Sequence, residues 1–255
     1  MELDIYVFLI VCPLVFLSGF VDAIAGGGGL ISLPAYFISG LPAHYALGTN
    51  KLSSMMGTSL TTYKFARLGY INVKRAFFAV IFAFIGSALG AKLALLVPDK
   101  TFKIVLLFVL PLSAFYILKS KNFAKESERG QSEIKVMLLC ALTALFIGMY
   151  DGIYGPGTGT FLILGFSYFA HCSLKNANGL AKAVNLATNI AAVCIFFYHD
   201  CVVIELGLIA GLFGLLGNYL GSSYFVKHGA IGTKKIMIVV ICIFMIKVIY
   251  DVTVV

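Results

Sequence analysis

The sequence predicts an all-α integral membrane protein of about eight transmembrane helices plus two short half-helices that follow glycine breaks. Of its 255 residues, 60% are hydrophobic and only 12% are charged, about half the charged share of a soluble domain. The mean hydropathy is +0.99. Such a chain lacks the polar surface that a soluble fold needs, which excludes soluble enzymes, disordered chains and nucleic-acid-binding modules.

Eight apolar runs are long enough, or nearly so, to cross a hydrocarbon layer of about 30 Å, which takes about 20 helical residues. Two further runs, Leu30–Ile38 and Phe161–Ala170, are too short to cross, and each follows a glycine cluster. We therefore expect these two to be half-helices in a hairpin or a broken helix. The eight predicted spans are Ile5–Val21, Leu52–Leu68, Ala76–Val97, Phe102–Leu118, Ile134–Tyr150, Ala183–Tyr198, Ile204–Val226 and Ile236–Ile249.

An internal duplication organises the chain. The segment around Asp22 aligns with the segment around Asp151 at an offset of 129, and after a two-residue insertion Lys51 aligns with Lys182 at an offset of 131. Matches between charged residues carry weight here because charges are rare. We predict a first membrane repeat over residues 1–118, a cytoplasmic linker over 119–133 and a second membrane repeat over 134–255.

The net charge of +8 comes from 19 basic and 11 acidic residues. In membrane proteins an excess of Lys and Arg is typical of cytoplasmic loops. If the linker is cytoplasmic and the two short runs turn back without crossing, fourteen basic residues fall on the cytoplasmic side and five fall outside. Both termini then lie outside the cytoplasm, and the two halves are inverted, as in many transporters. In the alternative, two parallel four-span halves, the basic residues do not concentrate on the cytoplasmic side in this way.

Only two acidic residues, Asp22 and Asp151, fall deep inside the apolar segments. A carboxylate in the membrane is costly unless it is paired, protonated or in contact with water. A functional interpretation is a proton or ion relay, or a carboxylate in a ligand site. A structural interpretation is a side chain that caps backbone amides of the glycine turn. The sequence leaves both open.

A glycine cluster follows each aspartate, Gly26–Gly29 in the first half and Gly155–Gly159, interrupted by Pro156 and Thr158, in the second. Glycine permits positive φ and a close approach of the backbone. A helix N-terminus in mid-membrane carries a partial positive charge that can bind an anion without a buried cation. Tight helix packing is the alternative explanation.

Polar residues also follow Lys51 and Lys182, which are predicted to begin spans. A lysine at such a place usually extends to the membrane interface. The polar residues continue at helical spacing, and such a stripe either joins helices or lines a substrate path. Because the stripe coincides with the glycine breaks, we favour a lining. Its members are Ser54, Thr58 and Thr61 in the first half and Asn185 and Asn189 in the second.

These features together define a predicted substrate site. No catalytic residue, cofactor or metal is expected, since the six cysteines form no C-x-x-C pair and show no metal-ligand spacing. The predicted binding residues are Asp22, Gly26, Gly27, Gly28, Asn50, Lys51, Ser54, Asp151, Gly155, Pro156, Gly157, Lys182, Asn185 and Asn189.

The motifs at residues 19–30, 46–52, 150–157 and 181–189 resemble the TauE/SafE family of membrane transporters, also called the sulfite exporter family, and in particular its poorly characterised bacterial branch. The resemblance extends over nearly the whole chain. It implies a bacterial inner or plasma membrane protein of about eight spans that moves small anions. The family's substrate class is sulfite, sulfonates and related organic acids.

We therefore predict a secondary transporter that exports a small sulfur-containing or organic anion, bound at the glycine-broken helices near the membrane midplane. Its expected partners are the anion and the lipid bilayer, with Asp22 or Asp151 as carrier of a coupling proton and no nucleic acid; the oligomeric state is left open. One alternative is a passive anion channel. Another is an intramembrane enzyme, but the second half of an intramembrane aspartyl protease signature, Gly-x-Gly-Asp, is missing because Thr158 follows Gly157.

Overall fold

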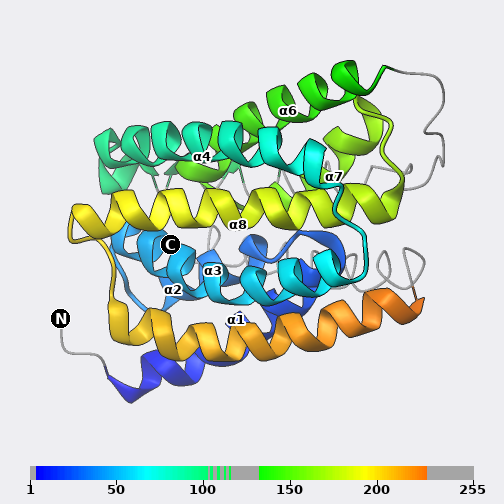
Figure 1. Cartoon of the computed structure of the whole chain (residues 1–255). Coiled ribbons are helices and arrows are strands. Elements are labelled where there is room, and N and C mark those ends of the chain that lie inside the picture. Colours follow the sequence, from blue (N-terminus) through cyan, green and yellow to red (C-terminus); the bar gives the residue numbers. More distant parts are fainter. Residues whose placement is uncertain are drawn as a thin grey trace.

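The computed structural model describes residues 4–102 and 132–228, with residues 104, 105, 108, 109, 112 and 115 between them. In this part of the chain every regular element is a helix (Figure 1), which confirms the all-α class. The helices are α1 (Ile5–Ala25), α2 (Gly29–Ile38), α3 (Ala43–Arg67), α4 (Val73–Leu96), α6 (Glu133–Ile153), α7 (Thr158–Tyr168), α8 (Leu174–Tyr198) and the helix Ile204–His228.

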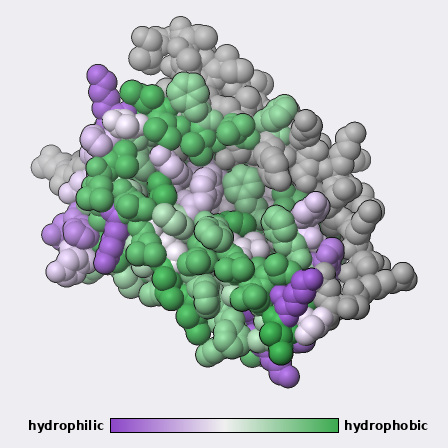
Figure 2. All heavy atoms as spheres, turned by 90° about the horizontal axis from the view of Figure 1, so that it is seen from above, coloured by the Kyte–Doolittle hydropathy of each residue, from purple (hydrophilic) through white to green (hydrophobic). Residues whose placement is uncertain are grey.

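Five of the described helices are long and apolar enough to cross a membrane: α1, α4, α6, α8 and Ile204–His228. Helix α3 is equally long, with 25 residues, but its polar stripe lowers its hydropathy. Figure 2 shows a broad band of hydrophobic side chains on one face, with hydrophilic side chains toward the two ends. The predicted spans Phe102–Leu118, apart from a few positions, and Ile236–Ile249 lie outside the described residues. The number of eight spans therefore stays a prediction.

Two helices begin earlier than the hydropathy predicts. The spans expected from Leu52 and Ala183 belong to α3 and α8, which begin at Ala43 and Leu174. The charges of Lys51 and Lys182 therefore lie inside helices rather than at their starts. The helices continue through these charges because both ammonium groups find carboxylate partners inside the protein, as described below.

A hydrophobic cluster at one end of the molecule brings α1 and α2 together as a hairpin. It contains Val11 of the first part of α1, Tyr36 near the end of α2, Ala43 at the start of α3 and Ala94 near the end of α4. The start of α1 and the end of α2 therefore lie at the same end. The 10-residue α2 runs back toward that end, as expected for a half-helix.

A second hydrophobic cluster at the opposite end does the same for α6 and α7. It joins Ala76 at the start of α4, Val136 at the start of α6, Phe166 near the end of α7 and Ala177 at the start of α8. The 11-residue α7 thus returns to the end from which α6 comes. The two hairpins enter from opposite ends, and their glycine breaks meet between the two clusters.

Two glycine-lined crossings connect the hairpins to the longer helices. A Cβ atom on Gly90 of α4 would lie 2.1 Å from the carbonyl oxygen of Met149 in α6. A Cβ atom on Gly221 of the helix Ile204–His228 would lie 2.3 Å from the carbonyl oxygen of Phe20 in α1. Such distances leave no room for a side chain, so glycine sets how closely these helices approach.

The turns that follow α3 and α8 lie at opposite ends of the molecule (Figure 1). In the turn after α8, the backbone N–H of Val203 donates to Thr49 Oγ1 at 3.0 Å. In the turn after α3, the carbonyl oxygen of Tyr70 lies against Gly179 near the start of α8. Each turn is thus held by the first part of the long helix from the other half.

Candidate functional site

The two glycine breaks contact each other directly. Gly26, with φ +76°, ends α1, and Gly157, with φ +82°, precedes α7. The backbone N–H of Thr160 donates to the carbonyl oxygen of Gly26 at 3.2 Å, and its hydroxyl donates to that of Ala25 at 2.7 Å. A Cβ atom on Gly26 would lie 2.2 Å from the carbonyl carbon of Gly159. Both φ and space therefore require glycine at this position.

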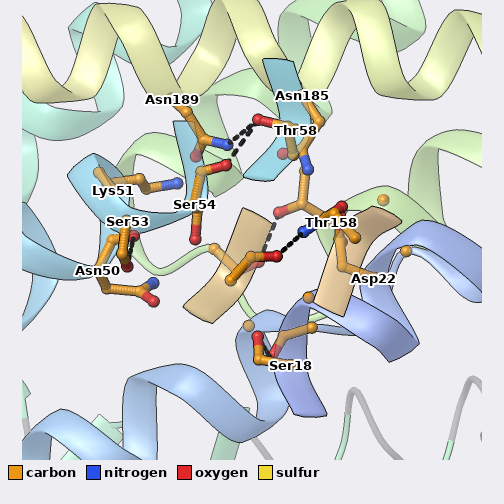
Figure 3. A pocket seen from close by; sticks show the side chains of 18 of the residues that line it. Ser18, Asp22, Asn50, Lys51, Ser53, Ser54, Thr58, Thr158, Asn185 and Asn189 are labelled. Carbon is orange, nitrogen blue, oxygen red and sulfur yellow. Dashed lines mark hydrogen bonds between the residues drawn. The ribbon is translucent and has the colours of Figure 1, made fainter. Parts of the chain in front are cut away.

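A cavity of about 500 Å³, counting its open mouth, lies beside this contact. Its walls come from both halves of the chain, and Figure 3 shows side chains of α1, α3 and α8 gathered around it. Its charged lining residues are Asp22, Lys51 and Asp151. The other polar lining residues are all uncharged: Ser18, Asn50, Ser53, Ser54, Thr58, Thr158, Asn185, Asn189 and Asn218.

The first ion pair joins Lys51 of α3 to Asp151 of α6. Lys51 Nζ lies 2.7 Å from Asp151 Oδ2, and the two side chains are only 2% and 3% exposed. The two groups form an ion pair, although Oδ2 accepts no hydrogen bond of good geometry in the described part of the chain. The pair therefore places a full positive and a full negative charge at the wall of the cavity.

The second ion pair joins Lys182 of α8 to Asp22 of α1. Lys182 Nζ donates to Asp22 Oδ2 at 2.8 Å and also to the main-chain carbonyl oxygen of Asp22. The lysine side chain is fully buried and the carboxylate is 12% exposed. The expectation that both lysines extend to the interface is thus wrong, because each is neutralised by the aspartate of the other half.

Unpaired polar groups remain at the cavity wall. Within the described part of the chain, the backbone N–H groups of Gly29 and Gly159, at the starts of α2 and α7, make no hydrogen bond. Asn50 Oδ1 is buried and also has no partner among the described residues. Deeper in the site, Asn189 Nδ2 donates to Thr58 Oγ1 at 3.4 Å. The wall can therefore bind a small polar ligand without first breaking all of its own hydrogen bonds.

Ten of the fourteen predicted site residues line the cavity. Of the other four, Lys182 lies behind Asp22, and Pro156 uses its carbonyl oxygen to accept a hydrogen bond from the Tyr150 hydroxyl at 2.7 Å. Gly157 caps α7, and Gly27 belongs to the turn between α1 and α2. The ten are Asp22, Gly26, Gly28, Asn50, Lys51, Ser54, Asp151, Gly155, Asn185 and Asn189.

The sequence analysis missed part of the lining. Asn218 is a lone amide in the apolar helix Ile204–His228, where it accepts from Thr61 Oγ1 at 2.8 Å. Ser18 lies one helical turn before Asp22 and donates to the carbonyl oxygen of Gly28 at 2.8 Å. Each is a scarce polar residue inside an apolar span, but its place at this cavity follows only from the packing of the helices. Thr58, which belongs to the predicted polar stripe, also lines the cavity. The other lining residues outside the predicted site are Val15, Gly19, Gly29, Ser53, Thr158, Gly159 and Gly214.

Among the described residues, His, Cys, Asp and Glu side chains form no group of three or more that could hold a metal ion. The polar groups at the cavity are instead amides, hydroxyls and two carboxylates with their lysines.

Comparison of the sequence with known proteins places the chain among membrane transporters. The sequence matches the family described as Sulfite exporter TauE/SafE over residues 11–248. It is 35% identical over 238 residues to "Probable membrane transporter protein ORF9" of Sinorhizobium sp, covering 93% of this chain and 90% of that protein. It is 31% identical over 251 residues to a "Probable membrane transporter protein" of Haemophilus influenzae, covering 98% of each chain.

A third relative, "Probable membrane transporter protein YfcA" of Escherichia coli K12, is 28% identical over 236 residues, which cover 92% of this chain and 87% of the relative. No solved structure matches the chain.

Proposed function

Because the chain belongs to the Sulfite exporter TauE/SafE family, whose relatives are named as membrane transporters, we propose that it is a secondary transporter of a small sulfur-containing or organic anion of the sulfite and sulfonate class. The anion binds in the cavity between the two glycine breaks, near the membrane midplane. The proposed direction is export from a bacterial cell.

One observation carries the proposal: the free donors and the cavity lysine converge where the two glycine breaks meet. The starts of α2 and α7 both line the cavity through Gly29 and Gly159, so their partial positive charges act on the same space. Lys51 adds a full positive charge at the same wall. Preorganised donors of this kind bind an anion in the membrane interior without a large reorganisation of the protein.

The contacts between the halves support an inverted-repeat transporter. Asp22 pairs with Lys182, and Asp151 pairs with Lys51. The aspartate of each half therefore pairs with the lysine of the other half. The glycine crossings are exchanged in the same way: α4 packs on α6, and the helix Ile204–His228 packs on α1. In this proposal the two halves move against each other around the cavity and open it alternately to each side. Both termini lie outside the cytoplasm.

The charge balance of the site supports coupling to a proton. The two buried lysines and two buried aspartates carry no net charge. An anion that enters this region adds an uncompensated negative charge, which is costly in a medium of low dielectric constant. Uptake of a proton with the anion removes this cost.

The function can be tested by flux in proteoliposomes loaded with sulfite, thiosulfate, methanesulfonate or small carboxylates, with and without a pH gradient. We expect saturable movement of at least one of these anions. Lys51→Met should reduce the flux at least tenfold, and Asn50→Ala, which leaves the ion pair intact, should reduce it several-fold.

Lys92→Met provides the matched control, because Lys92 lies on α4, is exposed and does not line the cavity. This variant should transport normally. The proposal fails if no anion moves under any gradient, or if Lys51→Met transports as well as Lys92→Met. Electrical recording separates a carrier from a channel, since steady currents far above the carrier turnover would indicate a pore.

A further inference from the structure

We infer that the two ion pairs have different roles: the bound anion takes Lys51 from Asp151, and Asp151 then takes up a proton, while the Lys182–Asp22 pair stays closed and holds the two halves together. The inference rests on the proposed function, and it specifies which acid in the site carries the proton.

The two pairs differ in which partner faces the cavity. Lys51 and Asp151 both line it, whereas of the second pair only Asp22 does. The side chain of Lys182 is fully buried behind this carboxylate. An anion in the cavity can therefore reach the ammonium group of Lys51 directly, but it meets the negative carboxylate of Asp22 before it can reach Lys182.

The pairs also differ in how firmly each lysine is held. Lys182 donates both to the carboxylate and to the main-chain carbonyl oxygen of Asp22. Lys51 has its ionic contact of 2.7 Å with Asp151, whose Oδ2 is buried without a hydrogen bond from the described residues. Because Lys182 must give up two oxygen partners and Lys51 only one among the described residues, Lys51 is the lysine that can change partner.

The ammonium group of Lys51 lies at the break before α7, where an anion has further donors. A Cβ atom on Gly155 would lie 3.1 Å from both Lys51 Nζ and Asp151 Oδ1. Because Gly155 has no side chain, both charged groups reach the turn. The backbone N–H of Gly159, which makes no hydrogen bond within the described residues, belongs to the same cavity. Asn50 Oδ1 also lies there without a partner among the described residues, and as an acceptor it is open to a donor group of a ligand. This buried, unpaired amide is a second sign that the wall is built for a ligand.

A proton on Asp151 balances the charges once Lys51 has turned to the anion. The ionisable groups that face Asp151 are Lys51 from α3 and, across the cavity, Asp22 from α1, which Lys182 of α8 neutralises. In the described structure α4, α7 and the helix Ile204–His228 bring no ionisable group to the lining. The carboxylate gains one proton and becomes a neutral carboxylic acid, so a monovalent anion and one proton enter together without net charge.

This linkage predicts the pH dependence of binding. Because a proton is bound with the anion, the affinity for a monovalent anion should rise as the pH falls, by at most about tenfold per pH unit. Methanesulfonate is the suitable probe, since its own charge does not change near neutral pH. A divalent anion such as sulfate should bind more weakly, because one proton leaves it half compensated.

Titration calorimetry of the purified full chain with methanesulfonate, in buffers with different heats of ionisation, counts the protons taken up. We expect about one proton per bound anion in the wild type and none in Asp151→Asn, which mimics the protonated acid and still binds the anion. The double variant Lys182→Met/Asp22→Asn is the matched control, because it removes the other ion pair as a unit and leaves the net charge of the site unchanged. It should keep the uptake of about one proton even if its affinity changes.

Infrared difference spectroscopy of the double variant Lys182→Met/Asp22→Asn, in which Asp151 is the one carboxylate that lines the cavity in the described structure, provides a second measurement if Asp151→Asn does not fold. Addition of methanesulfonate should then produce the carbonyl band of a newly protonated carboxyl group. Binding without proton uptake in the wild type, or proton uptake that persists in Asp151→Asn, would overturn the inference and leave the proposed function intact. Absence of binding and of flux for all the anions named above would overturn the proposed function, and the inference with it.

Discussion

At the scale of single residues, the charges inside the spans are held by partners from the other half of the chain. Both lysines and both aspartates are at most 9% exposed as whole residues. Isolated, each would carry a large desolvation cost, and the pairing offsets much of it. Removal of one partner should therefore be far more damaging than removal of both.

Lys182→Met should lower the free energy of unfolding by about 3–5 kcal/mol, because it leaves the Asp22 carboxylate buried and uncompensated. The double variant Lys182→Met/Asp22→Asn should regain most of this loss, since neither a charge nor an unpaired ion remains. Thermal and detergent-induced unfolding of the purified variants measures both effects. If the two single changes simply add in the double variant, the pair does not stabilise the protein as described.

Gly26→Ala should lower stability more than a change at a glycine of ordinary φ, because the added methyl group overlaps the backbone of Gly159 at 2.2 Å and the φ of +76° is itself strained for alanine. Gly40→Ala is the control, because it introduces the strain of a positive φ without a steric clash. Gly40 has a similar φ of +88° but no atom within 4 Å of an added Cβ, so it should lose only about 1–2 kcal/mol. Yield of monodisperse protein and thermal stability distinguish the two, and equal losses would contradict the close contact between the breaks.

At the scale of helices, hydropathy and glycine position predicted much of what the described residues contain. Both half-helices could be predicted, since a short apolar run after a glycine cluster has few other stable arrangements in a membrane. The starts of α3 and α8 could not, because a lysine inside a span looks like a span boundary until its carboxylate partner is known. Each partner lies about 100 or more residues away in the sequence.

The candidate site, like the helices, could be predicted from the sequence only in part. Residues at the aspartates, the glycine clusters, the aligned lysines and the polar stripe could be predicted from the repeat, and ten of the fourteen line the cavity. Asn218 and Ser18 could not, because single polar residues in apolar helices carry no information about which cavity they face until the helices are packed. The inequivalence of the two ion pairs is likewise a property of packing, since the alignment treats Asp22 and Asp151 as equal.

The two glycine crossings should tolerate no side chain. Gly90→Ala places a methyl group 2.1 Å from the Met149 carbonyl oxygen, and Gly221→Ala places one 2.3 Å from that of Phe20. Each should lower stability by about 1–3 kcal/mol through overpacking. Leu89→Val, beside Gly90 but 50% exposed, should change it by less than about 0.5 kcal/mol. Thermal unfolding in detergent compares the three, and a Gly90 variant as stable as the Leu89 variant would argue against the crossing.

At the scale of the whole molecule, the exchanged ion pairs and exchanged crossings make each half depend on the other. Neither half could bury its own aspartate or lysine charge alone, because each partner comes from the other half. We therefore expect the two halves to fold as one unit. The same dependence lets a change at the cavity act on both halves at once, as the proposed alternating access requires.

Inverted halves place Val73 and Tyr198 on opposite sides of the membrane. Both are highly exposed, at 77% and 83%, and they begin or end helices at opposite ends of the molecule (Figure 1). In a background without the native cysteines, a membrane-impermeant maleimide added to intact cells should label Tyr198→Cys but label Val73→Cys only after the cells are opened. Native Cys201, although near Tyr198, is a poor reporter because burial, aided by Asp200, raises the pKa of its thiol and slows its reaction. Two parallel halves would bring both sites to the same side of the membrane. Equal labelling of the two variants in intact cells would therefore contradict the inverted arrangement. Labelling of Val73→Cys alone would keep the inverted arrangement but reverse the proposed orientation.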